Sequence, residues 1–143
     1  MSDAILGTGV LLARGDAASP EVFTTLVEIR TIKPAQRSRN EIDVSTHNAG
    51  VEEKILGMLR TGQVTGTCNW LPSAATHAST GTGMLADLIN NTQSNWRITF
   101  PDSPATVYTF AARVQMFDPG EITTDSPMEF NYALTINGAI TET

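Results

Sequence analysis

The stretch Trp96–Met116, WRITFPDSPATVYTFAARVQM, decides the fold class that the sequence predicts. Apolar and polar side chains alternate on both sides of a proline-rich turn at 101–104, with the period of a strand that buries one face. Two such runs joined by a short turn are typical of neighbouring antiparallel strands. The stretch therefore predicts two adjacent strands of an antiparallel sheet.

Two other segments, Thr61–Leu71 and Met128–Ile136, alternate in the same way. Each places apolar side chains on one face and polar ones on the other, which is typical of a half-buried antiparallel strand. Short turns separate the strands predicted at 96–100, 108–116 and 128–136. This spacing favours a meander of antiparallel neighbours.

The N-terminal part carries a weaker strand pattern. A short apolar run at Val10–Arg14 predicts one strand, and the β-branched segment Val22–Ile32 predicts another. In that second strand, Phe23, Val27 and Ile29 are expected to share one face.

One segment near residues 84–90 has helical spacing. Its apolar positions are Met84, Leu85, Leu88 and Ile89. Asp87 is expected outside, Thr80 or Thr82 is a candidate N-cap, and Asn90-Asn91 is a candidate end. The elements together predict a mainly β fold, an antiparallel β-sandwich with one short flanking α-helix and a long inter-strand loop. We expect a single domain, 1–143, with an extended arm at about 33–60.

The segment Lys33–Arg60 is long for a connection in so small a domain, and long connections are often functional. It holds more than half of the nine basic residues. Weak alternation spans 41–46, whereas Val51–Arg60 has helical spacing and predicts a helix. The apolar residues Ile55, Leu56, Met58 and Leu59 are expected to cover the domain's own core or a partner's surface.

Composition and charge exclude several classes of protein. The chain has 143 residues and a formal charge of −6, so it lacks the excess of lysine and arginine that wraps nucleic acid. No apolar run is long enough to span a bilayer, and no basic segment precedes an apolar one at the N-terminus, so neither a membrane span nor a signal peptide is expected. The single cysteine, Cys68, is expected to be a buried apolar residue.

Tests for chemistry predict no catalytic residue, cofactor or metal site. The run GTGMLA at 81–86 matches a dinucleotide fingerprint, but it follows a polar loop rather than a buried parallel strand. His47 and His77, the only histidines, are expected to be solvated loop residues. Asp43 near His47 and His77 near Asp87 do not make convincing metal sets. The aromatic residues lie on apolar strand faces, where core packing explains them.

The order of these features resembles the tail tube proteins of long-tailed (siphovirus-like) bacteriophages, over about two thirds of the chain. The residues that carry the resemblance run from about Gly50 to the end: Ile55–Leu59, Gly62–Thr67, Asn69–Pro72, Gly83–Leu85, Trp96–Asp102, Tyr108–Phe110, Phe117–Gly120 and Ile136–Gly138. The turn at Ile98–Asp102 with its aromatic return strand, the glycine-containing strand and the final TINGA are the most specific of them. Residues before Val22 carry no specific match.

The resemblance implies a virion structural protein rather than an enzyme. Six copies would form a ring, and rings would stack into a hollow tail tube that conducts DNA out of the capsid without binding it tightly. It implies partners as well: further copies of the chain, a tape-measure protein and tail-end proteins. The expected location is the virion tail, assembled in the cytoplasm of a bacterial host.

Interface and lumen residues follow as further predictions. The long loop of the family reaches a neighbouring copy, so the interface is expected at Lys33, Arg37, Arg39, Ile55, Leu56, Met58 and Leu59. The polar face of one sheet would line the lumen, through Gln115, Glu129 and Asn131. An acidic tube would repel phosphate, and the basic arm would offset the repulsion between rings.

Two alternatives stay open at this point. One is the tube subunit of a phage-derived particle, a gene transfer agent or a bacteriocin, which uses the same subunit. The other is a monomeric β-sandwich that binds a carbohydrate or peptide, which would need an exposed aromatic cluster.

Overall fold

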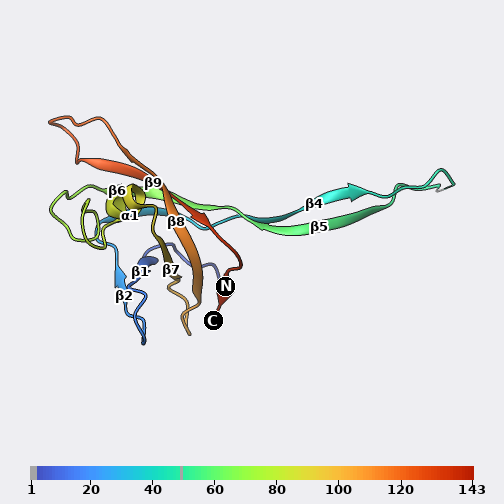
Figure 1. Cartoon of the computed structure of the whole chain (residues 1–143), viewed down its shortest axis with the longest axis horizontal. Helices are drawn as coiled ribbons and strands as arrows, with labels where there is room; N and C mark the ends of the chain where they lie inside the picture. The colour runs from blue at the N-terminus through green and yellow to red at the C-terminus, as the bar shows by residue number, and fades with distance from the viewer. Residues whose placement is uncertain (1–2, 49) are drawn as a thin grey trace.

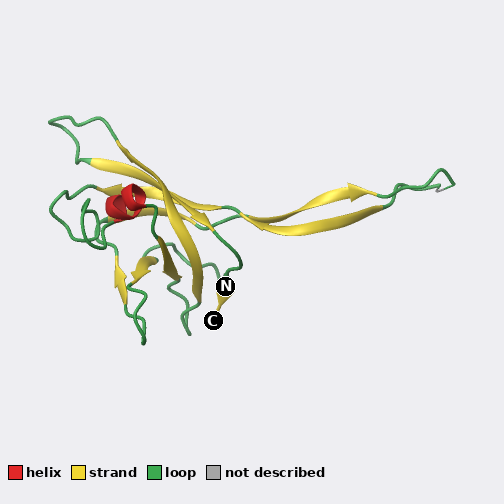
Figure 2. Ribbon diagram, in the orientation of Figure 1, coloured by secondary structure: helices red, strands yellow, loops and turns green. Residues whose placement is uncertain are grey.

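The computed structural model describes residues 3–48 and 50–143. Antiparallel strands and one short helix make up the fold, so the predicted mainly β class is confirmed (Figure 2). The elements in chain order are β1 (Leu11–Gly15), β2 (Phe23–Thr25), β3 (Ile29–Lys33), β4 (Arg37–Asp43), β5 (Lys54–Thr61), β6 (Gln63–Asn69), α1 (Met84–Asn90), β7 (Gln93–Thr99), β8 (Val107–Pro119), β9 (Glu129–Ile136) and β10 (Thr141–Glu142).

One sheet of eight strands forms the body of the molecule, in the order β2-β1-β7-β8-β9-β6-β3, with β10 paired to β8. The meander β7-β8-β9 is as predicted, with consecutive strands antiparallel. The sheet curls, because β1 and β3 contact each other although four strands lie between them in the order. A bulge between Val114 and Met116 bends β8, the longest strand.

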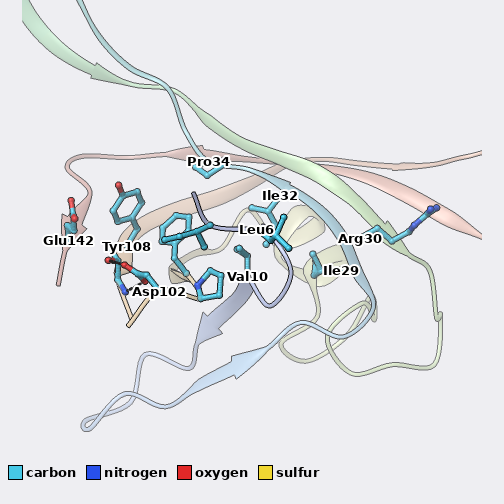
Figure 3. A pocket seen from close by; sticks show the side chains of 14 residues that line it. Leu6, Val10, Ile29, Arg30, Ile32, Pro34, Asp102, Tyr108 and Glu142 are labelled. Atoms are coloured by element: carbon cyan, nitrogen blue, oxygen red, sulfur yellow. Dashed lines mark hydrogen bonds between the residues drawn. The ribbon is translucent and has the colours of Figure 1, made fainter. Parts of the chain in front are cut away.

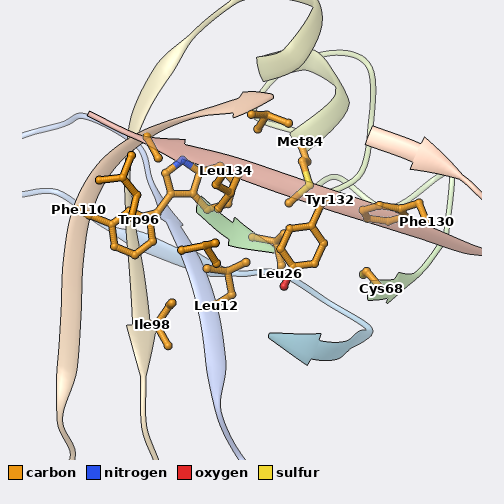
Figure 4. Packing of buried hydrophobic residues seen from close by; sticks show 14 residues of the cluster. Leu12, Leu26, Cys68, Met84, Trp96, Ile98, Phe110, Phe130, Tyr132 and Leu134 are labelled. Atoms are coloured by element: carbon orange, nitrogen blue, oxygen red, sulfur yellow. The ribbon is translucent and has the colours of Figure 1, made fainter. Parts of the chain in front are cut away.

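The curled sheet encloses one apolar core (Figure 4). Most of the apolar residues predicted to face inward from β6, β7, β8 and β9 are buried there, and the largest of them are Trp96, Tyr132, Phe130, Ile98 and Leu134. Trp70, Phe100 and Tyr108 are only partly buried, and Met116, beyond the bulge, is exposed. Cys68 is fully buried, as expected. The Tyr132 hydroxyl donates to the Thr31 carbonyl oxygen at 3.0 Å, which joins β9 to the edge strand β3 across β6.

The N-terminal part differs from its prediction, because 22–32 is two strands rather than one. The chain breaks at Glu28, whose φ of 64° is left-handed, so β2 pairs with β1 and β3 pairs with β6. Leu26, between the strands, is the buried residue, and its N–H donates to the Leu12 carbonyl oxygen at 2.8 Å. Val27, predicted to share the buried face, is exposed.

The predicted helix exists, but it buries a different face. Its N-cap is Gly83 without a side-chain cap, so neither Thr80 nor Thr82 caps it, whereas Asn91 ends it in the left-handed conformation as expected. Ile89 is exposed, and Asp87 is buried rather than outside. Asp87 accepts two hydrogen bonds from the Arg14 guanidinium of β1, at 2.6 and 2.9 Å, which fix the helix to the sheet.

The helix predicted over Val51–Arg60 is wrong. That segment contains β5, which pairs with β4 to form a separate two-stranded sheet. The ribbon projects far from the body, as Figure 1 shows. The extended arm at about 33–60 is thus a β-hairpin, and at about 3.4 Å per residue its seven-residue strand β4 is on the order of 24 Å long.

Candidate functional site: the projecting hairpin and the polar sheet face

The β4–β5 hairpin has no contact with the core along most of its length. Every residue of β4 is exposed, and in β5 only Gly57 and Thr61 are partly covered. The ladder continues to Val44, whose N–H donates to the Glu53 carbonyl oxygen at 2.9 Å. An isolated two-stranded ribbon is at best marginally stable in water. The hairpin therefore has little beyond its own ladder to stabilise it.

Large apolar side chains lie on both faces of this ribbon. Cross-strand partners share a face, so Ile42 and Ile55 lie together on one side, and Leu56 lies opposite Glu41 on the other. Met58 is 79% exposed, more than any other apolar side chain in either strand. The four apolar residues predicted for the interface, Ile55, Leu56, Met58 and Leu59, all lie on the hairpin. The interface prediction did not include Ile42, Val44 and Val51, which are also exposed on the hairpin.

Two of the three basic residues predicted for the interface, Arg37 and Arg39, lie on the hairpin. The Arg37 guanidinium lies 5.4 Å from the centre of the Tyr108 ring, which anchors the root to β8. Arg39 donates to the Gly57 carbonyl oxygen at 2.8 Å. Lys33 ends β3 in the main sheet, so it lies apart from the hairpin strands.

The three predicted lumen residues lie on the outer, polar face of the main sheet. Thr67 donates to the Asn131 side-chain oxygen at 3.0 Å, Gln115 accepts from Gln63, and Glu129 pairs with Arg30. Paired positions across β6 and β9, such as Thr65 with Ala133, face the same way. Hydroxyl and amide groups therefore dominate this face, rather than the carboxylates that an acidic wall would need.

The buried thiol and imidazole do not form a nucleophile and base. His77 is only 1% exposed, so the prediction of a solvated loop residue is wrong. Its Nδ1 accepts from the Leu71 N–H at 3.2 Å, so the ring proton lies on Nε2, 3.0 Å from the Val27 carbonyl oxygen and 3.3 Å from the Cys68 sulfur. Burial raises the pKa of the Cys68 thiol to about 12, which keeps it protonated. The histidine ties backbone groups together.

Other chemical features have structural explanations within residues 3–48 and 50–143. A Cβ on Gly83 would lie 2.1 Å from the Ala78 carbonyl oxygen, so the glycine of the GTGMLA run permits a close backbone approach before α1. No group of three or more metal-binding side chains gathers in these ranges. No helix in them is long and apolar enough to cross a membrane.

No protein-family model matches the chain, and no curated protein matches it in sequence. Solved structures do match its fold. A chain in the tail of an empty gene transfer agent particle, with C6 symmetry, has a TM-score of 0.74 at 15% identity, covering 98% of this chain and 99% of that one. A chain of the SPP1 tail tube has a TM-score of 0.74 at 12% identity, covering 97% and 78%. A chain in the six-fold symmetrised baseplate of the anti-feeding prophage has a TM-score of 0.74 at 10% identity, covering 100% and 97%. At such low identities the likeness shows the fold, and it is a fold found in tails and tubes of phage-like particles.

Proposed function

We propose that the protein is the tube subunit of a phage or phage-derived tail, in which six copies form a ring and rings stack into a hollow conduit. The observation that carries the proposal is the β4–β5 hairpin, a solvated ribbon with apolar residues on both faces. Soluble monomers rarely expose an apolar surface of this kind, and such a surface usually marks an interaction site. The likeness to chains of six-fold tails and tubes supplies the form of the assembly.

The polar sheet face suits the wall of the conduit. Most of its side chains are neutral hydroxyls and amides, and its charges are of both signs, with Arg30 paired to Glu129 and Arg113 opposite Thr135, so DNA would pass without a strong electrostatic attraction to the wall. In this proposal Gln115, Glu129 and Asn131 face the lumen, and the repulsion comes from the overall charge of −6 per copy rather than from an acidic wall. This subunit would suit the tail of a long-tailed phage virion, with a tape-measure protein and tail-end proteins as partners. It would suit a gene transfer agent or a bacteriocin equally well.

The experiment is assembly of the purified chain, followed by negative-stain microscopy and analytical ultracentrifugation. We expect rings of six 15.3 kDa copies, about 92 kDa in total, and hollow tubes at high concentration. Leu56→Asp with Met58→Asp should abolish both, because it places two charges on the exposed apolar surface of the hairpin. Ile122→Asp is the control, since Ile122 is 62% exposed, close to the 63% of Leu56, and lies in the loop between β8 and β9. Rings formed as readily by the double variant as by the wild type would contradict the proposal.

A further inference from the structure

The pair Asn137-Gly138, within the TINGA run, places an amide side chain next to a backbone nitrogen that no side chain shields. Asn137 is the only one of the eight asparagines that precedes a glycine. Both residues are exposed, and a Cβ built on Gly138 would meet nothing within 4 Å. The Gly138 φ of 98° lies in a region that glycine adopts without steric cost. The two groups therefore have open space around them.

The pair lies in a gap of the strand ladder. Strands β9 and β10 pair with β8 one after the other, and the chain between them, 137–140, leaves the sheet. Figure 3 shows where the chain has rejoined β8, with Glu142 beside Tyr108 at the edge of a pocket. In the part of the chain that the structure describes, the Gly138 N–H has no hydrogen-bond partner. A backbone nitrogen inside a ladder is held by its hydrogen bond, whereas this one can turn toward the preceding side chain.

Two hydrogen bonds connect the pair to other strands. The Asn137 side-chain nitrogen donates to Oε1 of Gln93, the first residue of β7, at 3.1 Å. The Thr61 hydroxyl donates to the Gly138 carbonyl oxygen at 3.1 Å, and Thr61 is the last residue of β5. The first bond restrains the amide of Asn137. The second fastens the root of the hairpin to the body and leaves the Gly138 nitrogen unengaged.

We propose that Asn137 is a site of spontaneous deamidation in the folded protein. The Gly138 backbone nitrogen attacks the side-chain carbonyl carbon of Asn137 and forms a C–N bond. This nitrogen gives its proton to solvent, and the side-chain nitrogen leaves as ammonia. Water then opens the resulting five-membered succinimide at either carbonyl, which yields aspartate or isoaspartate. Solvent water is the only co-reactant, and no group is oxidised or reduced.

Either product changes the contacts at this junction. Aspartate replaces the donor –NH₂ by a carboxylate oxygen, so Gln93 must rotate its amide to keep the bond. Isoaspartate also routes the main chain through the former side chain and lengthens it by one carbon, which displaces the Gly138 carbonyl from Thr61. Deamidation would thus loosen the fastening between the hairpin root and the body. The inference concerns the single chain and does not rest on the proposed tube.

Peptide mapping by mass spectrometry, after incubation of the protein at pH 8, measures the reaction at each asparagine in one sample. Asn95 and Asn131 are internal controls, because both are exposed but precede tryptophan and tyrosine. Product at Asn137 should accumulate well ahead of product at either control. Gln93→Ala, a change at an exposed position, frees the side-chain amide and should raise the rate at Asn137 about twofold or more, since an exposed hydrogen bond contributes little.

A parallel incubation in urea separates the effect of the fold from that of the sequence, because the unfolded chain retains only the Asn-Gly pair. Reaction at Asn137 in the native protein, above both controls, would support the proposal. Fast reaction in urea with none in the native protein would show that the fold shields the pair, and would overturn it. A native rate at Asn137 no higher than at Asn95 or Asn131 would overturn it as well. An unchanged rate in Gln93→Ala would overturn the restraining role of that hydrogen bond.

Discussion

Removing the Arg14 guanidinium should destabilise the body of the molecule more than any surface change, because it isolates a buried carboxylate. The Asp87 side chain is 3% exposed, and both its oxygens accept from Arg14. Loss of one partner of a buried ion pair costs about 3–5 kcal/mol. Arg14 itself is 12% exposed, so some water reaches the pair and we expect about 3 kcal/mol for Arg14→Met. That is a large share of the roughly 5–15 kcal/mol that stabilises a typical domain.

The stability of the Arg14→Met variant should depend on pH in the direction that the buried Asp87 carboxylate sets. Burial already raises the pKa of Asp87 above its ordinary value of 3.8, and Arg14 opposes that rise. Without Arg14 the pKa rises further, so the folded state holds the proton more tightly than the unfolded state. Stability of the variant should therefore increase as the pH falls from 7 through the folded pKa toward 3.8, with a steeper slope than the wild type shows.

Urea unfolding followed by tryptophan fluorescence measures both quantities, because Trp96 is fully buried in the core. The companion variants are Asp87→Asn and the double variant Arg14→Met/Asp87→Asn, which complete a double-mutant cycle. The double variant should be more stable than Arg14→Met alone, since no unpaired charge remains. A cost below about 1 kcal/mol for Arg14→Met at pH 7, or no gain on acidification, would refute this reasoning.

Three further outcomes follow from the structure. Gly66→Ala places a methyl 2.1 Å from the Thr31 carbonyl oxygen and should lower the free energy of unfolding in urea by about 1–3 kcal/mol or more. Gly50→Ala, with nothing within 4 Å of the added methyl, should cost far less, and equal costs would be inconsistent with the clash. Native Cys68 should resist iodoacetamide at pH 8 and react in urea, and fast native labelling by mass spectrometry would disprove its protonated, buried state. Asn91→Ala should lower the melting temperature by forcing a left-handed alanine, at about 1–2 kcal/mol, while Asn91→Gly should not; similar melting curves for both would argue against this cap.

The strands of the body were predictable because one of their faces is buried. Burial imposes a strict period of two, so Trp96, Ile98 and Phe110 pointed inward in sequence and in structure alike. Side-chain contacts between segments far apart in the sequence leave no such periodic pattern. Asp87 reads as an outward residue of a short helix until Arg14, 73 positions away, is placed against it. The same holds for His77, whose ring is held by the backbone of Val27 and Leu71.

The hairpin was mispredicted for a different physical reason. In a ribbon solvated on both sides, neither face is buried, so no period of two is imposed on β5. The register between Arg39 and Glu41 also shifts, with three steps along β5 from Leu59 to Leu56 against two along β4. This bulge puts Leu56 and Leu59, three residues apart, on one face of the ribbon, and that is a helical spacing rather than a strand spacing.

The same absence of a buried face leaves the hairpin with little stabilisation beyond its own ladder. Ordering a residue's backbone costs about 1–2 kcal/mol, and β4 and β5 contain 7 and 8 residues with almost no burial to offset that cost. The body has its own core and needs no such help. Folding of the body and ordering of the hairpin are therefore separable, and under the proposed function the second would be coupled to association. In the proposed tube, such a subunit would keep a stable body at low concentration and order its hairpin where another copy supplies the missing contacts.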